Sequence, residues 1–250
     1  MRLLAFLFTF VLILCGGDVS CSHAVTGAST PKWSFSGILG KFDRPAVQRG
    51  YQVYREVCSS CHSMKRIAFR NLKEVGFTEA EVKAIAGSYT MTDGPDEKGD
   101  MFERPGIASD YFPSPFPNRE AAAAANNGAV PPDLSLITKA RHNGPDYVYR
   151  LLTEYKGSDP DEGGLYRNDV FPGGRIAMAP PLSEGQVGYM DETEASVENM
   201  AKDVVSFLQW AAEPEMEQRK RLGIKVVLSL IAATVLVIFV NKRLWGPLCK

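Results

Sequence analysis

Cysteine and histidine are scarce in this sequence, and neither sign of charge predominates. The 250 residues include five cysteines and three histidines, and five cysteines are far too few for a disulfide-built scaffold. The 28 basic residues nearly balance the 29 acidic ones, which excludes a basic nucleic-acid arm and a disordered acidic tail. There is no internal repeat and no collagen-like composition, and 45% of the residues are hydrophobic. We therefore expect an ordinary globular domain with no nucleic-acid partner.

The balanced total hides an uneven distribution of charge. Residues 25–218 contain 28 Asp and Glu against 20 Lys and Arg, whereas residues 219–250 contain seven Lys and Arg and no acidic residue. An acidic body joined to a basic tail is not typical of a cytosolic enzyme. The two ends of the chain account for the asymmetry.

The N-terminal residues have the three parts of a secretory signal peptide. Met1-Arg2 supplies the charged start, Leu3–Leu14 the apolar stretch and Ser22-His23-Ala24 the small-x-small ending. The apolar stretch is too short to span a bilayer, which takes about 20 residues. We predict that residues 1–24 are a signal peptide and that the chain after them is exported. The alternative is an uncleaved anchor or a buried helix.

A second apolar stretch lies near the C-terminus. Leu222–Val240 is 19 residues long with Lys225 as its only charge, and such a helix covers roughly 28 Å, enough for the hydrocarbon core. Basic residues flank both ends, which favours a transmembrane anchor over a buried core helix. We predict an exported domain over 25–217, an anchor helix over 218–243 and a short cytoplasmic tail over 244–250. This orientation places the domain in the periplasm of a bacterial inner membrane, or on the equivalent intermembrane-space side.

The exported part is predicted to consist of helices separated by long loops rich in proline and glycine. Apolar residues at helical spacing predict helices over 44–57 and 197–212, and a capping box at Thr78–Glu81 predicts a short helix ending at Gly87. Asn118 is suited to cap a helix over 121–125. Two further short helices are predicted over 134–140 and 146–155, divided by Asn143-Gly144-Pro145. No stretch shows the alternation of a strand, so the predicted fold class is mostly α.

One motif carries chemistry. Cys58-Ser59-Ser60-Cys61-His62 has the spacing of a c-type haem attachment site. Three residues apart at the end of a helix, the two thiols face the same way and can form thioethers with the two haem vinyl groups. His62 then offers its imidazole to the iron. Export supports this interpretation, because c-type haem is attached outside the cytoplasm.

Three other sites could use the same residues. A thioredoxin-like redox pair requires a strand before it, whereas a helix is predicted here. A structural zinc site requires four ligands, and the adjacent Cys61 and His62 cannot easily bind one tetrahedral ion together. A structural disulfide between Cys58 and Cys61 is the third alternative. All three are weaker than covalent haem c.

A haem iron used for electron transfer needs a sixth ligand, and the chain offers His142 and several methionines. Met64 follows His62 too closely to reach the opposite haem face. Met178 lies between Gly173-Gly174 and Pro180-Pro181, which allow a close turn and then stiffen the chain. Met178 is therefore the favoured candidate, with ordinary core packing as the alternative.

These residues belong to a longer series of motifs that resembles the cytochrome c1 family, whose members carry the haem of cytochrome bc1 complexes. The matching stretches extend from Trp33 to about Trp245. They include Tyr51–Met64, Met101–Gly106, Ser109–Pro113, Ala125–Ser135, Ala140–His142, Met178–Pro181, Ala201–Val204 and Trp210–Glu215. Several motifs in order over the whole exported part are much more specific than the haem motif alone.

The resemblance implies a class I cytochrome c-like haem domain with long loops, followed by one C-terminal transmembrane helix. It implies one haem c, attached through Cys58 and Cys61 and ligated by His62 and Met178. Arg141 is expected to pair with a haem propionate, and His142 is not expected to be a ligand. The remaining residues expected to line the haem pocket are Tyr54, Asn126, Pro132 and Tyr147. The chain lacks the second cysteine pair that clamps the distal loop in some bacterial relatives, so Pro180-Pro181 must contribute more of its rigidity.

The resemblance also implies a function: a redox subunit of quinol–cytochrome c oxidoreductase that takes an electron from the Rieske iron–sulfur protein and passes it to a soluble or tethered cytochrome c. No catalytic acid, base or nucleophile is expected on this chain. The implied partners are cytochrome b, the Rieske protein, cytochrome c and membrane lipid, in a dimeric complex. Two alternatives are a membrane-tethered cytochrome c outside any such complex and a haem peroxidase.

Overall fold

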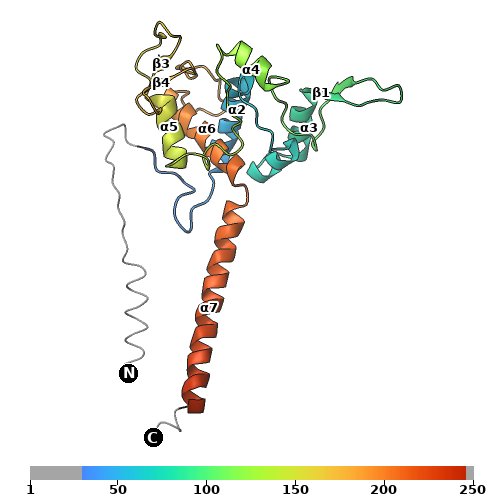
Figure 1. Cartoon of the computed structure of the whole chain (residues 1–250). Helices are drawn as coiled ribbons and strands as arrows, with labels where there is room; N and C mark the ends of the chain where they lie inside the picture. Colours follow the sequence, from blue (N-terminus) through green and yellow to red (C-terminus); the bar gives the residue numbers. More distant parts are fainter. Residues whose placement is uncertain (1–29, 246–250) are drawn as a thin grey trace.

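The computed structural model describes residues 30–245, which form a mostly helical domain followed by one long isolated helix (Figure 1). The predicted signal peptide and the last five residues lie outside this range. The helices are α2 (Arg44–Glu56), α3 (Glu79–Gly87), α4 (Arg119–Ala125), α5 (Gly144–Thr153), α6 (Val197–Ala212) and α7 (Met216–Trp245), with two 3-10 helices, η1 (Cys58–Ser60) and η2 (Phe69–Val75).

The core forms where α2 packs against α6. Both helices bury the apolar stripe that the sequence predicts, including Val47 and Tyr54 of α2 and Val204 and Leu208 of α6. The two backbones come very close at Gly50, because a Cβ there would overlap the Asp203 carbonyl group. The predicted helices over 44–57 and 197–212 are confirmed.

Two predicted helix starts are also confirmed, and in each the predicted side chain makes the capping bond. Thr78 and Glu81 form the reciprocal capping box of α3, with Thr78 N donating to Glu81 Oε2 over 2.7 Å. The Asn118 Oδ1 accepts from Ala121 N over 2.8 Å at the start of α4. These bonds satisfy amide groups that the first helical turn leaves without a partner.

The predicted helix over 134–140 is wrong. The segment is a series of turns, in which Ile137 N donates to Leu134 O and Ala140 N to Leu136 O. At its start, Leu134 N donates to the distant Ser63 carbonyl over 2.9 Å, so a tertiary contact anchors this series of turns. The next helix, α5, begins at Gly144 and ends at Thr153, slightly earlier than the predicted 146–155.

The described residues also include two small antiparallel hairpins that the sequence did not predict. In the first, β1 (Thr90–Asp93) pairs with β2 (Phe102–Pro105). In the second, β3 (Tyr166–Arg167) pairs with β4 (Arg175–Ile176). Strands of two to four residues are too short to show a clear alternating pattern.

The last helix, α7, leaves the domain as a single rod and is long and apolar enough to cross a membrane (Figure 1). Only Glu213–Glu215 separate it from α6. Two ion pairs hold this connection, from Glu213 to Lys139 and to Arg219. A third pair joins Arg44 of α2 to Glu217 of α7 over 3.1 Å.

Candidate functional site

The cysteine–histidine motif occupies a single tight turn directly after α2. Cys61 N and His62 N both donate to the Cys58 carbonyl oxygen, over 3.2 and 2.8 Å. Cys58 is half-buried and Cys61 exposed, and both thiols are free. The hydroxyl groups of the intervening Ser59 and Ser60 bond back to the Arg55 and Val57 carbonyls. The turn is therefore held by its own backbone, and the two thiols remain available.

The His62 ring is oriented by the segment around residue 132. Its Nδ1 lies 2.8 Å from the Pro132 carbonyl oxygen, which can only accept, so Nδ1 carries the hydrogen and Nε2 keeps a free lone pair. Burial lowers the pKa of His62, although the bond to Pro132 and the nearby Asp133 oppose this. The Tyr54 hydroxyl donates to the His62 carbonyl over 3.3 Å. The neutral imidazole thus presents Nε2 as a ligand.

Asp133 is a positioning residue that the sequence analysis missed. Its Oδ2 accepts from the Ser63 hydroxyl and from Lys65 N over 2.8 and 2.9 Å, and its Oδ1 accepts from Ser135 N over 2.9 Å. Burial alone would raise the pKa of Asp133, but these hydrogen bonds outweigh it and lower the pKa. The Asp-x-Ser spacing could have indicated the local bond to Ser135, but not the partners some 70 residues away.

Met178 lies just beyond β4, in a different local network. The Tyr155 hydroxyl donates to the Met178 carbonyl over 3.0 Å. Tyr155 also forms an isolated bridge with Asn168. The fully buried Asn168 donates to Leu151 O over 2.8 Å and accepts from Val170 N over 3.1 Å. These contacts fasten the Met178 loop to the end of α5.

The other predicted site residues lie on separate segments of the domain. Arg141 is exposed and makes no ion pair within residues 30–245, so its guanidinium is available to an anionic group. Tyr147 of α5 is half-buried against the core. Asn126 ends α4 and donates to Ala122 O over 2.7 Å. Within the described residues, hydrogen bonds join Tyr54, His62 and Pro132, whereas Met178, Arg141 and Asn126 belong to separate networks.

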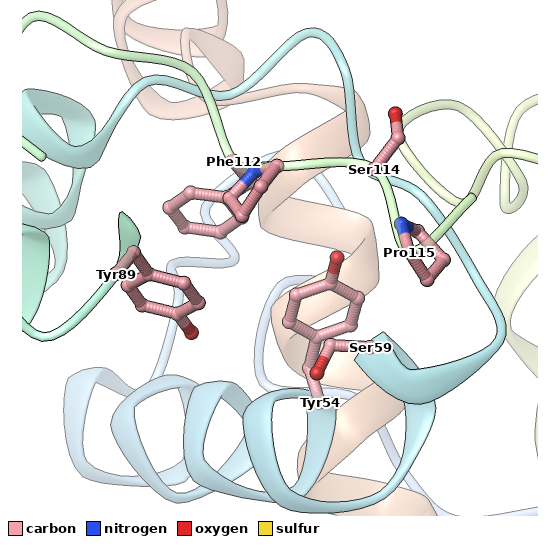
Figure 2. Close-up of a pocket in the computed structure, with 7 residues that line it drawn as sticks. Tyr54, Ser59, Tyr89, Phe112, Ser114 and Pro115 are labelled. Atoms are coloured by element: carbon pink, nitrogen blue, oxygen red, sulfur yellow. The ribbon is translucent and has the colours of Figure 1, made fainter. Parts of the chain in front are cut away.

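A small pocket borders the motif on the side of Ser59. It has a volume of about 90 Å³ and is lined by Tyr54 and Ser59 from one side and by Phe112, Ser114 and Pro115 from the facing segment, as Figure 2 shows. Ligand sites are commonly about 300–1,000 Å³. This pocket is therefore too small to hold a macrocycle by itself.

Comparison with known proteins identifies the family that has this cysteine–histidine turn in a mostly helical domain followed by one long apolar helix. Residues 33–248 match the profile of the Cytochrome C1 family. The chain belongs to that family. It is 44% identical to cytochrome c1 of Rhodospirillum rubrum, over 94% of this chain and 93% of the relative. It is 49% identical to the mitochondrial cytochrome c1-2, heme protein, of Solanum tuberosum, over 92% and 90% of the two chains.

One relative is much longer than this chain. The protein named cytochrome b/c1 from Bradyrhizobium diazoefficiens is 49% identical over 92% of this chain, but the match covers 38% of that relative.

The resemblance to the cytochrome c1 family and the mostly helical fold class are both confirmed. Membership of the cytochrome c1 family implies a haem c cofactor.

The donor groups of this cytochrome c1 family member fit such a cofactor. Cys58 and Cys61 are free thiols on one turn, and His62 Nε2 is a free imidazole donor, which is the set that covalent haem c requires. The alternatives fit less well. Within residues 30–245 no three His, Cys, Asp or Glu side chains gather as a zinc site would need. Burial raises the pKa of Cys58 to about 12, whereas a redox pair needs a lowered one.

Proposed function

We propose that this chain is the haem-bearing electron-transfer subunit of a quinol–cytochrome c oxidoreductase of the cytochrome bc1 type. The observation that supports this most directly is the Cys58–His62 turn, in which two free thiols accompany an imidazole with its Nε2 free. The membership of the cytochrome c1 family over nearly the whole described chain points to the same function.

Particular residues would hold the cofactor. Cys58 and Cys61 would form the two thioethers, and His62 and Met178 would ligate the iron. When bound, the haem iron supplies one-electron exchange between its ferrous and ferric states. Arg141 would pair with a propionate through its free guanidinium. The pocket would be lined by Tyr54, Asn126, Pro132 and Tyr147.

The protein's own contribution is to orient the two iron ligands. The Pro132 carbonyl fixes the tautomer of His62, and Asp133 fixes the segment that carries Pro132. The Tyr155 hydroxyl holds the Met178 backbone. A ligand that keeps its position in both redox states keeps reorganisation small. In this proposal no side chain of this chain acts as an acid, base or nucleophile, because quinol oxidation belongs to other subunits.

The proposed partners follow from this role. The name of the Bradyrhizobium relative joins cytochrome b and c1 in one protein, which supports cytochrome b as a neighbour. The electron donor would be the Rieske iron–sulfur protein and the acceptor a soluble or tethered cytochrome c, within a dimeric complex. With α7 in the membrane, residues 25–217 would lie in the periplasm or the intermembrane space.

Haem attachment is tested by replacing both cysteines of the motif. In the Cys58→Ser, Cys61→Ser double variant, acid–acetone should extract all haem from the chain, whereas the haem of the unmodified protein should resist extraction. Cys249→Ser is the matched control, because Cys249 lies outside the motif. The readout is the pyridine haemochrome spectrum of the extracted and residual fractions. Complete extraction from the unmodified protein would contradict the proposal.

Distal ligation is tested separately with Met178→Leu, which removes the thioether and keeps an apolar side chain. The variant should retain covalent haem, bind carbon monoxide in the reduced state and lose on the order of 0.1 V of reduction potential, because axial ligands strongly influence that potential. Met190→Leu is the control, since Met190 is fully exposed. An unchanged potential without carbon monoxide binding would show that another residue is the ligand.

A further inference from the structure

Two large aliphatic side chains stand at the tip of a tight turn before α2. Gly40 N donates to Gly37 O over 3.4 Å, which places Ile38 and Leu39 at the two central positions of the turn. The two residues are 74% and 79% exposed. Such positions usually carry Gly, Pro, Asn, Asp or Ser. A pair of aliphatic residues contributes nothing to this turn or to the core, so it calls for a partner outside the domain.

The base of this turn is firmly held. Phe35 and Phe42 are buried on its two sides, with ring centroids 5.6 Å apart. Lys41 N donates to Ser34 O over 3.0 Å and closes the loop. Trp33 stacks on Phe35 at 5.4 Å. Ile38 and Leu39 are therefore projected from a fixed base.

The turn lies beside the first turns of α7. Lys220 Nζ donates to Phe35 O and Gly40 O over 2.6 and 3.2 Å, and Phe42 N donates to Glu217 Oε1 over 2.9 Å. In Figure 1 the loop hangs below the domain on the side from which α7 departs. Lys220 precedes the apolar stretch that begins at Leu222. The tip therefore lies near the level at which α7 would enter a bilayer.

The charges around the tip suit a lipid surface. Lys32 and Lys41 flank the tip and are both exposed, and the nearest acidic residue in the sequence is the exposed Asp43. Arg219 and Arg221, on the adjoining turns of α7, are also exposed, although each pairs with a glutamate, Glu213 and Glu217 respectively. Apolar side chains surrounded by basic ones are typical of segments that lie at the boundary between headgroups and acyl chains.

We propose that Ile38 and Leu39 insert into the acyl boundary of the bilayer that α7 spans, as a second membrane contact of the domain. This inference rests on the proposed placement of α7 in a membrane. With two contacts, the domain is held at one tilt to the membrane plane. A single helix would leave it free to lean.

The test places a photoreactive side chain at the tip. Leu39→p-benzoyl-phenylalanine is introduced into the full chain, the complex is irradiated in native membranes, and the adducts are identified by mass spectrometry. Phospholipid adducts should form several-fold more often than in a Met190→p-benzoyl-phenylalanine control, whose site is fully exposed. Ile38→p-benzoyl-phenylalanine repeats the measurement should the first variant fail to accumulate.

Each other outcome has a defined meaning. Adducts to another polypeptide in place of lipid would overturn the proposal and identify the tip as a protein interface. Lipid adducts no more frequent than in the Met190 control would overturn it in favour of a solvated tip. Alkaline carbonate extraction of the same membranes reports on α7 separately. If the chain is extracted, the membrane placement fails; if it stays in the pellet while Leu39 finds no lipid, only the insertion of the tip fails.

Discussion

His62 and Met178, the two residues proposed to ligate the haem iron, are held by very different amounts of structure. His62 follows directly from α2, which is buried against α6, and its ring is fixed by a segment that Asp133 bonds three times. Met178 follows a two-residue strand and is held through its backbone by the single hydroxyl of Tyr155. The proximal side thus shares the stability of the core, whereas the distal side depends on a few local hydrogen bonds.

The largest effect is expected from the core that supports the proximal side. Phe207 is fully buried and packs against Tyr51, Tyr54 and Trp210. Phe207→Ala should cost about 3–5 kcal/mol of unfolding free energy, because it removes a buried ring and leaves a cavity. Denaturant unfolding followed by circular dichroism measures this, with Ile107→Ala at an exposed site as the control. A loss below about 1 kcal/mol would show that the α2–α6 contact does not dominate stability.

Asp133→Ala should have the next largest effect. It should lower the free energy of unfolding by about 1–3 kcal/mol, because two backbone N–H groups and one hydroxyl lose their acceptor. The lowered pKa of Asp133 means that its charge stabilises the fold above its ordinary pKa of about 4 and that this contribution is lost as the pH falls through the lower folded value. Asp133→Asn keeps an acceptor oxygen and should abolish this acid-dependent loss. Identical acid unfolding curves for Asp133→Asn and the unmodified protein would contradict the assignment.

Tyr155→Phe isolates the distal side. It removes the hydrogen bond to the Met178 carbonyl and should lower the free energy of unfolding by about 0.5–1.5 kcal/mol. We expect a small fall in reduction potential and a weaker absorption band from the thioether–ferric iron bond, with the proximal side unaffected. Tyr166→Phe, on the nearby strand β3, is the control, because the Tyr166 hydroxyl makes no hydrogen bond to the described residues. Equal effects of the two variants would exclude a positioning role for Tyr155.

The smallest structural effect is expected at the acidic loop between β1 and β2. Replacing Asp96, Glu97 and Asp100 by their amides should change stability only slightly, since the amide oxygen of Asp96→Asn still accepts from Lys98 N and Asp100 N. If the loop steers a basic cytochrome c, the rate of its reduction should depend less steeply on salt in the triple variant, because charges steer association over about 10 Å at 0.1 M salt. The same changes at Asp191, Glu192 and Glu194 are the comparison. If the salt dependence changes only there, the docking site lies at the second loop.

The comparison of the two sides also explains what the sequence could predict. The motif and the stripes of α2 and α6 are local patterns with the helical period, so the sequence alone predicts the proximal turn and both helices. Asp133 contacts Ser63 and Lys65 across about 70 residues, and Tyr155 reaches Met178 across 23. No local pattern carries such contacts, which are decided by how the loops fold over the core.

The segment over 134–140 is the converse case, in which the sequence predicts a helix that the structure does not have. Its composition favours a helix, but the structure has a series of turns there, anchored by the bond from Leu134 N to the distant Ser63 O. A tertiary contact here overrides the local preference. The short hairpins form for a similar reason, as parts of loops that the domain folds around, and their strands are too brief to leave a pattern.

The three-residue connection between α6 and α7 has a consequence for how the domain can move relative to the membrane. Glu213 pairs with Lys139 and Arg219, and Glu217 pairs with Arg44. These ion pairs and the short connection join α7 directly to the core. In the proposed complex, any tilt of α7 in the bilayer would therefore tilt the haem domain by the same angle, because the two would move as one body.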